Sequence, residues 1–369
     1  MKNKKSQKTV LLGLSGGVDS AVAALLLKKQ GYRVIGIFMQ CFSNKDKKLI
    51  GDCNVTTDKK DAQKISVILN IPIIILNYEK EYRKYVIEPM FKSYALGLTP
   101  NPDSLCNKLI KFPFLWKEAK KFNADYIATG HYTRTKKKRG SYHLFMGKDK
   151  TKDQSYFLYE LKQKDLRHTL FPIENLRKSE VRKIAKKAGF SNWDKRSTRG
   201  ICFVGKVDMK SFLQQKIEFR RGLVKNPEGE VIGEHNGIMF YTIGERIGEK
   251  YGIKINKEYK NIQGKKLYIA GKIKKNNTLI AAPEGHAALL RDFFIISNTN
   301  WISGRPKFPL NNVKVRVRHL GELIPVEIQY KNRRYICKLK RAIKGIADGQ
   351  SAVIYRGKEL LGGGEIRFG

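Results

Sequence analysis

The sequence VLLGLSGGVDS, which runs from Val10 to Ser20, decides the fold of the first half of the chain. Its apolar start, Val10–Leu14, predicts a short buried strand, and the Ala- and Leu-rich segment Ser20–Gln30 predicts a helix. Between them, Gly16 and Gly17 allow the main chain to approach a ligand closely. Because a helix start offers free N–H groups to an anion, this loop is a candidate phosphate site.

The loop differs from the two common glycine-rich nucleotide loops. No Gly-Lys-Ser/Thr follows it, as a P-loop requires, and Ser15 stands where the GxGxxG motif needs a glycine. Asp19 is unusual in an anion site, and it either caps the helix or holds Mg²⁺ against a triphosphate. An ordinary glycine-rich turn with a Ser/Asp cap is the alternative interpretation.

Strands and helices alternate through the first 130 residues, which predicts a parallel sheet with helices on both faces. Ligands of such sheets bind at the carboxyl ends of the strands, where the 13–20 loop lies. The other predicted strands are Arg33–Met39, Ile71–Asn77 and Tyr126–Thr129, and the predicted helices are Thr57–Asn70, Glu79–Tyr94, Phe112–Phe122 and, farther on, Lys178–Gly189.

After about residue 205, glycines and short alternating runs replace the helical pattern. This change predicts antiparallel β-structure, first a small middle domain and then a barrel or sandwich, of which we expect the barrel. The expected domains are 1–205, 206–275 and 276–369. The predicted strands are Glu230–Gly233, Gly237–Ile243, Lys266–Ala270, Asn277–Ala281, Val313–Arg318, Pro325–Tyr330, Tyr335–Lys340 and Ser351–Tyr355.

The chain is strongly basic. Its 369 residues include 74 Lys and Arg against 33 Asp and Glu, a formal net charge of +41. Nucleic acid is the commonest partner of so basic a chain, and a lysine-rich genome is the alternative explanation. No apolar run approaches the roughly 18 residues of a membrane-spanning helix, and the N-terminus lacks the apolar segment of a signal peptide. We therefore expect a cytoplasmic protein without a membrane partner.

Five widely spaced cysteines form no CxxC pair, so neither a disulfide scaffold nor a structural zinc site is predicted. Cys106 follows Asp103 by three residues in the proline-stiffened segment TPNPDSLCN, and Cys202 lies between two glycines in RGICFVG. Taken alone, each is better explained as a small buried hydrophobe. The basic residues around Cys202 nevertheless favour a thiolate: Lys195, Arg196, Arg199 and Lys206. The remaining cysteines, which we expect to be structural or incidental, are Cys41, Cys53 and Cys337.

The motif SGGVDS resembles the pyrophosphate loop of the ATP pyrophosphatase superfamily, whose members cleave ATP to AMP and pyrophosphate and adenylate a carbonyl oxygen. Other motifs follow it in order: NPDSLCN (101–107), GHY (130–132), KDQSYFL (152–158), GICFVG (200–205), GEHNG (233–237), GQSAV (349–353) and LGGG (361–364). Together they resemble the tRNA-specific 2-thiouridylase family from residue 10 to about residue 364. The resemblance implies a Rossmann-like first domain of the adenine nucleotide alpha hydrolase type, followed by two smaller β-rich domains.

The resemblance also implies an activity, the ATP- and Mg²⁺-dependent 2-thiolation of the first anticodon uridine in lysine, glutamate and glutamine tRNAs. ATP adenylates the C2 oxygen, a cysteine persulfide delivers sulfur, and AMP and pyrophosphate are released. Cys202 is then the persulfide carrier, Cys106 the partner thiol that forms a transient disulfide with it, and Asp103 the acid/base beside the base. The implied partners are the tRNA anticodon stem-loop and a sulfur-relay persulfide donor protein.

By the same resemblance, the ATP-binding residues are Gly13, Leu14, Ser15, Gly16, Gly17, Val18, Asp19, Ser20, Met39 and Gly130. The residues implied to contact tRNA or its target base are Asn101, Pro102, Asp103, Lys152, Asp153, Gln154, Arg318 and His319. Mg²⁺ comes with ATP, with Asp19 as its candidate ligand, and neither a permanent metal nor an iron–sulfur cluster is expected.

One stretch departs from the family pattern, because Ser197, Thr198 and Arg199 stand where an acidic residue, Ser, and Thr or Gln usually precede Gly-Ile-Cys. The contacts that close this loop therefore stay open. His131 is either a catalytic base or a structural imidazole. Rival classes are another adenylating tRNA-modifying enzyme, such as a lysidine synthetase or a cluster-dependent thiolase, and a non-catalytic RNA-binding protein. The spread of the cysteines argues against the cluster-dependent type.

Overall fold

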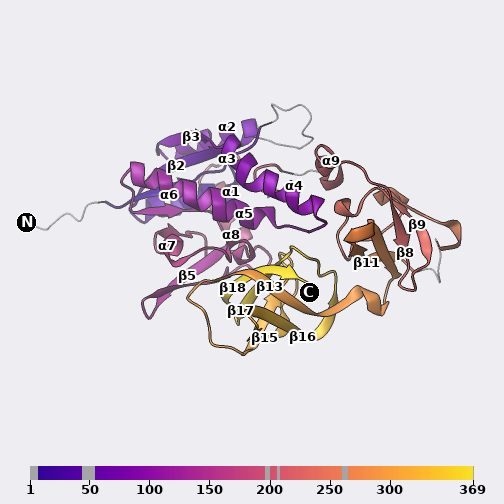
Figure 1. Cartoon of the computed structure of the whole chain (residues 1–369). Coiled ribbons are helices and arrows are strands. Elements are labelled where there is room, and N and C mark those ends of the chain that lie inside the picture. The colour runs from indigo at the N-terminus through magenta and orange to yellow at the C-terminus, as the bar shows by residue number, and fades with distance from the viewer. Residues whose placement is uncertain (1–6, 44–54, 196–199, 206–207, 260–264, 369) are drawn as a thin grey trace, which may run out of the picture.

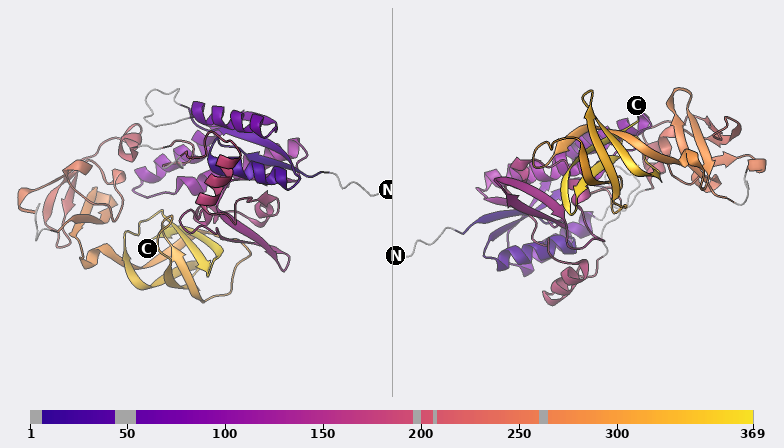
Figure 2. Two further views of the ribbon diagram at one scale, coloured as in Figure 1. Left: turned by 180° about the vertical axis from the view of Figure 1, so that it is seen from behind. Right: turned by 90° about the horizontal axis from the view of Figure 1, so that it is seen from below.

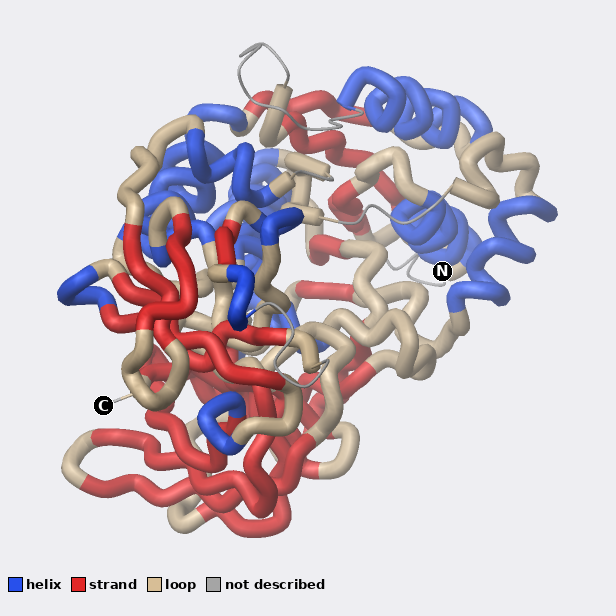
Figure 3. Tube along the Cα trace, turned by 90° about the vertical axis from the view of Figure 1, so that its right-hand side faces the viewer, coloured by secondary structure: helices blue, strands red, loops and turns tan. Residues whose placement is uncertain are grey.

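The computed structural model describes residues 7–43, 55–195, 200–205, 208–259 and 265–368. Within these ranges the chain forms three β-sheets, each at the centre of one domain (Figure 1). The first sheet is surrounded by helices, whereas the other two domains consist mainly of strands and loops (Figure 3). The middle domain lies to one side of the other two (Figure 2).

The first domain contains a parallel sheet with the strand order β3-β2-β1-β4-β7. Its strands are β1 (Thr9–Gly13), β2 (Arg33–Gln40), β3 (Ile73–Asn77), β4 (Tyr126–Ala128) and β7 (Thr169–Leu170). Every neighbouring pair is parallel, so the predicted parallel sheet is confirmed. Because β1 has β2 on one side and β4 on the other, the loops after β1 and β4 meet at the carboxyl edge of the sheet.

Helices cover both faces of this sheet. Leu11 of β1 packs in one core with Leu115, whereas Val10 and Leu12 pack in the second core with Ala24. Successive strand residues point to opposite faces, which explains why the first strand is apolar throughout. The helices of the chain are α1 (Val18–Lys29), α2 (Val55–Ile68), α3 (Glu79–Tyr82), α4 (Glu88–Ala95), α5 (Pro102–Cys106), α6 (Phe112–Lys121), α7 (Gln163–Leu166), α8 (Lys178–Lys187) and α9 (Met209–Gln214). None of the helices in the described ranges is long and apolar enough to cross a membrane.

Two π-helical segments interrupt the helices on one face of the sheet. The predicted helix Glu79–Tyr94 is divided into α3, the π-helical segment η1 (Arg83–Ile87) and α4. A second π-helical segment, η2 (Asn107–Lys111), joins α5 to α6. The two segments pack against each other, and α5 packs against both. Such segments are frequent at functional sites, which draws attention to the region around Cys106.

The middle domain contains a five-stranded sheet with the order β10-β9-β8-β12-β11. Its strands are β8 (Gly222–Lys225), β9 (Val231–His235), β10 (Ile253–Ile255), β11 (Leu267–Ile273) and β12 (Thr278–Pro283). The expected domain boundary at residue 275 lies inside the β11–β12 hairpin, and β12 also pairs with β8. The chain therefore leaves this sheet only after Pro283, because the two hairpin strands cannot belong to different domains.

The predicted strand Gly237–Ile243 was wrong. Ile238–Phe240 forms a 3₁₀ turn instead, and Gly237, with a φ of 132°, directs the chain out of β9. The buried ring of His235 accepts a hydrogen bond from the Gly237 N–H (2.8 Å), and its second nitrogen lies 3.0 Å from the Asn277 carbonyl oxygen. The GEHNG motif thus makes a turn and ties β9 to the β11–β12 hairpin.

The last domain is a closed antiparallel barrel. Its strands are β13 (Leu290–Trp301), β14 (Leu310–Arg316), β15 (Ile324–Lys331), β16 (Arg334–Lys344), β17 (Ser351–Arg356) and β18 (Glu359–Arg367). The order is β13-β16-β15-β14-β17-β18, and pairing of β13 with β18 closes the ring, which confirms the expected barrel. Apolar side chains such as Phe294, Val315 and Ile354 fill its interior.

A hairpin of the first domain extends the barrel sheet. Its strands β5 (Thr133–Lys138) and β6 (Ser141–Met146) were absent from the sequence expectation, and β6 pairs with β18 through Phe145 and Glu359 (Figure 1). Two further contacts join the same domains: the Tyr156 hydroxyl donates to the Ser351 carbonyl (3.0 Å), and the Thr99 N–H donates to the Asp348 carbonyl (2.8 Å). The barrel is therefore attached directly to the domain that carries the phosphate loop.

Candidate active site

The predicted phosphate loop, residues 13–20, follows β1 and leads into α1. Gly17 is the residue before the first turn of α1, and no side chain caps the helix start. The hydroxyl groups of Ser15 and Ser20 lie 3.2 Å apart, and the Ser20 hydroxyl donates to the Gly17 carbonyl (3.0 Å). The loop is thus closed by its own hydroxyls, and the N–H groups of the first helical turn remain available for an anion.

Close packing requires glycine at one position within the loop, Gly16, and at one position beside it, Gly130. Gly16 has a φ of +76°, and a Cβ atom there would lie 2.1 Å from the Asp58 carbonyl oxygen. Gly130, which follows β4, would place a Cβ atom 2.8 Å from the main chain of Asp19. The Asn192 amide donates to the Gly16 carbonyl (2.8 Å) and supports the loop from a third side. The other expected ATP residues lie at the same edge of the sheet or line its core: Gly13, Leu14, Val18 and Met39.

Asp19 lies in the first turn of α1 and takes part in an ion pair. Both of its carboxylate oxygens accept from the Lys178 ammonium group (2.6 and 2.7 Å), and the Tyr132 hydroxyl donates to one of them (2.7 Å). Helix capping, one of the two sequence-based alternatives for Asp19, is not observed. Burial lowers the pKa of Lys178, Asp19 opposes this effect, and the nearby charges of Arg182 and Lys152 add to the lowering. The Lys178 ammonium group therefore lies beside Asp19 in the first turn of α1, and the charges of Arg182 and Lys152 act on it.

A second group of reactive side chains, the thiol cluster, contains Asp103, Cys106, Lys111 and Cys202. The Asp103 carboxylate accepts a hydrogen bond from the Cys202 N–H (2.8 Å), and the Lys111 ammonium group donates to the Cys202 sulfur (3.7 Å). Tyr82 donates its hydroxyl to the Cys202 carbonyl. The structure thus brings together the two cysteines and the aspartate that the sequence indicated, and it adds Lys111 and Tyr82, which the sequence analysis missed.

The two thiols of the cluster differ in acidity. A hydrogen bond from Cys106 lowers the pKa of Cys202, burial opposes this effect, and the Lys111 charge lowers the pKa further. Burial raises the pKa of Cys106, which is completely inaccessible to solvent, and its interaction with Cys202 raises it further. Cys202 is therefore the thiol that ionises first.

Of the cations expected near the Cys202 thiol, Lys195 is the one that lies in the described residues, and its ion pairs are with other groups. Lys195 forms ion pairs with Asp58 (2.7 Å) and Asp61 (2.5 Å) rather than with the thiol, because its ammonium group is closer to these α2 carboxylates. Within the described residues, the Lys111 ammonium group donates a hydrogen bond to the Cys202 sulfur. The remaining expected cations, and the departure from the family pattern, lie outside the described residues: Arg196, Ser197, Thr198, Arg199 and Lys206.

The loop around Cys202 has a strained main chain. Gly200 and Gly205 have φ values of 115° and 85°, and Phe203, which carries a side chain, has a φ of 67°. The Phe203 ring packs edge-on against Tyr82, with centroids 5.8 Å apart, and the Lys111 ammonium group lies 5.6 Å from its centre. A bulky residue in the left-handed region requires support from its surroundings, and here the Tyr82 ring and the Lys111 side chain provide it.

The other candidate groups of the sequence analysis have structural surroundings. His131 is buried, lies 2.7 Å from the Thr129 hydroxyl and stacks on Phe112, and burial holds its pKa well below the usual range. These contacts favour the structural alternative for His131. Cys337 lies in the barrel core, Cys41 is buried, and Cys53 lies outside the described residues. In the described part of the chain, no group of three or more His, Cys, Asp or Glu side chains could hold a metal ion.

The residues expected to contact tRNA lie where the first domain meets the barrel. Asn101 caps α5, whose first residue is Pro102, and its amide donates to the Ser351 hydroxyl (3.1 Å). His319 is 2.9 Å from the Asp153 carbonyl oxygen, and its ring lies 4.3 Å from that of Phe157. Exposed Arg318 donates to the Gly345 carbonyl.

The KDQ segment, residues 152–154, is held by its middle residue. The carboxylate of Asp153 is buried, and it accepts from the Arg316 guanidinium (2.8 Å) and the Ser155 hydroxyl (3.0 Å). Gln154 accepts from the Tyr132 N–H (3.0 Å). The Asp153 carboxylate thus faces the protein interior, and the partly exposed Lys152 is the charged side chain of this segment that reaches the surface.

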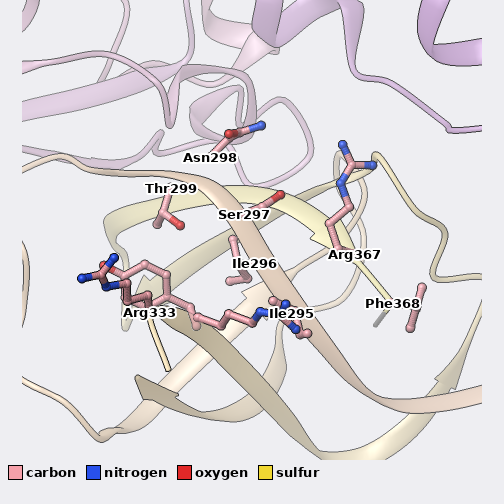
Figure 4. A pocket seen from close by; sticks show the side chains of 10 residues that line it. Ile295, Ile296, Ser297, Asn298, Thr299, Arg333, Arg367 and Phe368 are labelled. Carbon is pink, nitrogen blue, oxygen red and sulfur yellow. The ribbon is translucent and has the colours of Figure 1, made fainter. Parts of the chain in front are cut away.

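Two cavities lie outside the phosphate loop and the thiol cluster. The first, of 580 Å³, lies on the barrel, with Arg333 and Arg367 on opposite sides and Ser297 and Asn298 between them (Figure 4). Its positive charge is partly neutralised, because Arg367 pairs with Glu365 (2.8 Å). The second, of 510 Å³, is lined by residues of all three domains, including Tyr94, Thr242, Arg318 and Gln350.

Comparisons with known proteins agree with this architecture. Residues 8–206 match the tRNA methyl transferase HUP domain, residues 210–283 the tRNA methyl transferase PRC-barrel domain, and residues 291–366 the aminomethyltransferase beta-barrel domain. The tRNA-specific 2-thiouridylase MnmA of Nitrosomonas europaea is 40% identical over 98% of both chains. The enzyme of the same name from Bacillus cytotoxicus is 40% identical over 99% of this chain and 96% of its own.

Among solved structures, the NMN synthetase from Francisella tularensis aligns over 52% of this chain and 67% of its own, with 20% identity and a TM-score of 0.31. The parallel sheet, its glycine-rich 13–20 loop and the matched HUP domain define a nucleotide-binding class of protein, and in this chain Cys106 and Cys202 lie together in the same domain. The near-complete match at 40% identity then shows that the chain belongs to the tRNA-specific 2-thiouridylase (MnmA) family.

Proposed function

We propose that this chain catalyses the ATP-dependent 2-thiolation of the first anticodon uridine in lysine, glutamate and glutamine tRNAs. The observation that carries the proposal is the thiol cluster, in which the Asp103 carboxylate and the Lys111 ammonium group both contact Cys202. A phosphate loop in the same domain supplies the means to activate a substrate oxygen with ATP. Membership of the 2-thiouridylase family connects the two.

In the first step the uridine C2 oxygen attacks the α-phosphorus of ATP and pyrophosphate leaves. The N–H groups of the 13–20 loop and the nearby cations Lys178, Arg182 and Lys152 are suited to the charge that develops on the departing phosphates. Mg²⁺ bound with ATP would neutralise phosphate charge. Asp19 fits the role of its ligand, because it is a carboxylate beside the helix start that already holds a cation, the Lys178 ammonium group.

Sulfur transfer follows at the thiol cluster. The terminal sulfur of a Cys202 persulfide attacks C2, and AMP leaves with the former C2 oxygen. The Cys106 thiol then gives up its proton to solvent and its sulfur attacks the Cys202 sulfur, so that the S–S bond to the transferred atom breaks, the sulfur stays on C2 and a Cys106–Cys202 disulfide forms. A dithiol reductant restores the two thiols. Asp103 is the acid/base group for the uridine N3 proton, and burial raises its pKa despite the opposing Cys202 N–H.

The target uridine must leave the anticodon stack to reach Cys202, so the enzyme needs a basic rim around the pocket. We propose that the junction between the first domain and the barrel forms this rim and takes up the anticodon stem-loop in the cytoplasm. Its residues include Asn101, Pro102, Lys152, Gln154, Arg318 and His319, and Asp153 positions the segment between them. A persulfide donor protein loads Cys202.

Mass spectrometry of tRNA nucleosides tests the function directly. The tRNA is incubated with the enzyme, Mg-ATP and a small persulfide donor, and the products from ATP are analysed in parallel. We expect 2-thiouridine at the first anticodon position together with AMP and pyrophosphate. Unmodified tRNA, or ADP as the ATP product, would contradict the proposal. A modified cytidine in place of the thiouridine would identify a lysidine-type enzyme.

A further inference from the structure

Lys111 occupies a position that the proposed reaction does not yet explain. Its ammonium group donates to the Cys202 sulfur (3.7 Å) and lies over the Phe203 ring, 5.6 Å from its centre. Among the residues that the structure describes, no carboxylate lies within 4.0 Å of this ammonium group. Its hydrogen-bond acceptor is therefore a sulfur atom, which is an unusual partner for a partly buried lysine.

The local helix geometry explains how Lys111 reaches the thiols. Lys111 is the fifth residue after Cys106, and in an α-helix, at 100° per residue, the two side chains would point about 140° apart. The segment between them, η2, is π-helical, and its i→i+5 hydrogen bonding returns the fifth residue to the same side. The π-helical segment thus places the ammonium group on the side of the cluster that Cys106 occupies.

We propose that Lys111 is a catalytic residue whose ammonium group holds Cys202 as the reacting thiolate and, once sulfur is loaded, as the persulfide anion. The persulfide part of this inference rests on the proposed function. Lys111 keeps its proton throughout: the Cys202 proton passes to solvent, and the positive charge stays beside the sulfur. The positive charge of Lys111 also acts on Cys106, but complete burial keeps Cys106 as the neutral thiol that donates to Cys202.

The charge of Lys111 itself agrees with this role. Burial disfavours its protonated form, but Cys202, Cys106 and Asp103 together outweigh burial, and its pKa is raised. A lysine whose charge is stabilised by neighbouring sulfur atoms must, by the same interaction, stabilise negative charge on them. The thiolate therefore depends on the Lys111 charge, whereas the Lys195 ammonium group pairs with the α2 carboxylates.

The experiment is the pH profile of Cys202 alkylation by iodoacetamide in the full-length protein, with each cysteine quantified by mass spectrometry of its peptide. In Lys111→Met we expect the midpoint of the profile to rise by about one unit or more, so that alkylation near neutral pH slows about tenfold. Lys111→Arg should restore most of the rate. The matched control is Lys108→Met, three residues earlier on the same segment, whose ammonium group pairs with Glu160 at the surface and should leave the profile unchanged.

An unchanged Cys202 midpoint in Lys111→Met, or an equal shift in Lys108→Met, would overturn the proposal. If Lys111→Met fails to fold, Lys111→Gln and Lys111→Arg are compared: a shift in the first with rescue by the second supports the role of the charge, and equal profiles overturn it. The readout needs neither tRNA nor ATP. A wild-type enzyme that does not thiolate tRNA would therefore disprove the proposed function and leave the effect of Lys111 on Cys202 measurable.

Discussion

The phosphate loop and the thiol cluster belong to one domain but are built in opposite ways. The loop consists of eight consecutive residues, 13–20, and offers mainly main-chain groups at the start of α1. The thiol cluster joins Asp103, Cys106 and Lys111 to Cys202, which is 99 residues after Asp103 and lies in a loop with a strained main chain. A site made of consecutive residues can be recognised from the sequence, whereas the partners in an assembled site become visible only in the fold.

The two sites are nevertheless connected through one segment. Asn192 donates to the Gly16 carbonyl, and three residues later Lys195 pairs with Asp58, whose own carbonyl oxygen is the atom that a Cβ at Gly16 would meet first. In the sequence, Cys202 follows Lys195 by seven residues. The following expectations, from the largest effect to the smallest, test how far the loop and the cluster act separately.

The largest effect is expected at the thiol cluster. Cys202→Ser should lose both persulfide loading and tRNA thiolation, because the sulfur carrier is gone. Cys106→Ser should still load sulfur on Cys202 but should fail to complete thiolation, because no second thiol attacks the Cys202 sulfur. Persulfide mapping by mass spectrometry, combined with analysis of tRNA nucleosides, checks both variants. Cys337→Ser, in the barrel core, is the control for loss of a buried thiol. Sulfur found on Cys106 in Cys202→Ser would reverse the assigned roles.

The next effect concerns the phosphate loop. Asp19→Asn should lower tRNA-dependent formation of AMP and pyrophosphate roughly 10²-fold, because the amide loses the charge that holds Lys178 and is available to Mg²⁺. The measurement is release of pyrophosphate at saturating ATP. Exposed Asp292, on β13, provides the control Asp292→Asn, which should be unaffected. If the sites are separate, Cys202 alkylation stays normal in Asp19→Asn, and a changed alkylation rate would show that the loop and the cluster are coupled.

A smaller effect, on stability, separates two neighbouring glycines. Gly16→Ala should lower the free energy of unfolding by about 2–4 kcal/mol, because it adds left-handed strain to a clash with the Asp58 carbonyl. Gly17→Ala is the matched control: the φ of Gly17 is −86°, and its Cβ atom would meet nothing nearer than Ser15 Oγ at 3.4 Å. Its cost should stay within about 1 kcal/mol. Denaturant unfolding measures both variants, and equal costs would contradict the close approach of α2 to the loop.

Features made of consecutive residues could be predicted from the sequence, whereas contacts between distant segments could not. The parallel sheet, its helices and several barrel strands were predicted because apolar periodicity is a local signal. The β5–β6 hairpin was missed because Lys136–Lys138 is polar and its strand gains stability by pairing beside the barrel. Lys195 was assigned to the thiol because it is near in sequence, whereas in the fold it contacts α2. Lys111 was missed because its approach to Cys202 depends on a π-helical segment that spacing rules for α-helices do not include.

The smallest effect is expected at the proposed tRNA surface, because we expect many weak contacts to share the binding energy there. Arg318→Gln should weaken tRNA binding several-fold and reduce the slope of log affinity against log salt by about 0.7–0.9, as loss of one phosphate contact requires. ATP binding should be unchanged, since Arg318 belongs to the barrel side of the junction. Arg356→Gln, an exposed arginine at the end of β17, is the control and should keep the wild-type slope. Binding is measured by fluorescence anisotropy at several salt concentrations.

A wild-type affinity that stays constant from low to moderate salt would mean that the net charge of +41 reflects genome composition, and the basic rim would no longer explain how an anticodon reaches Cys202.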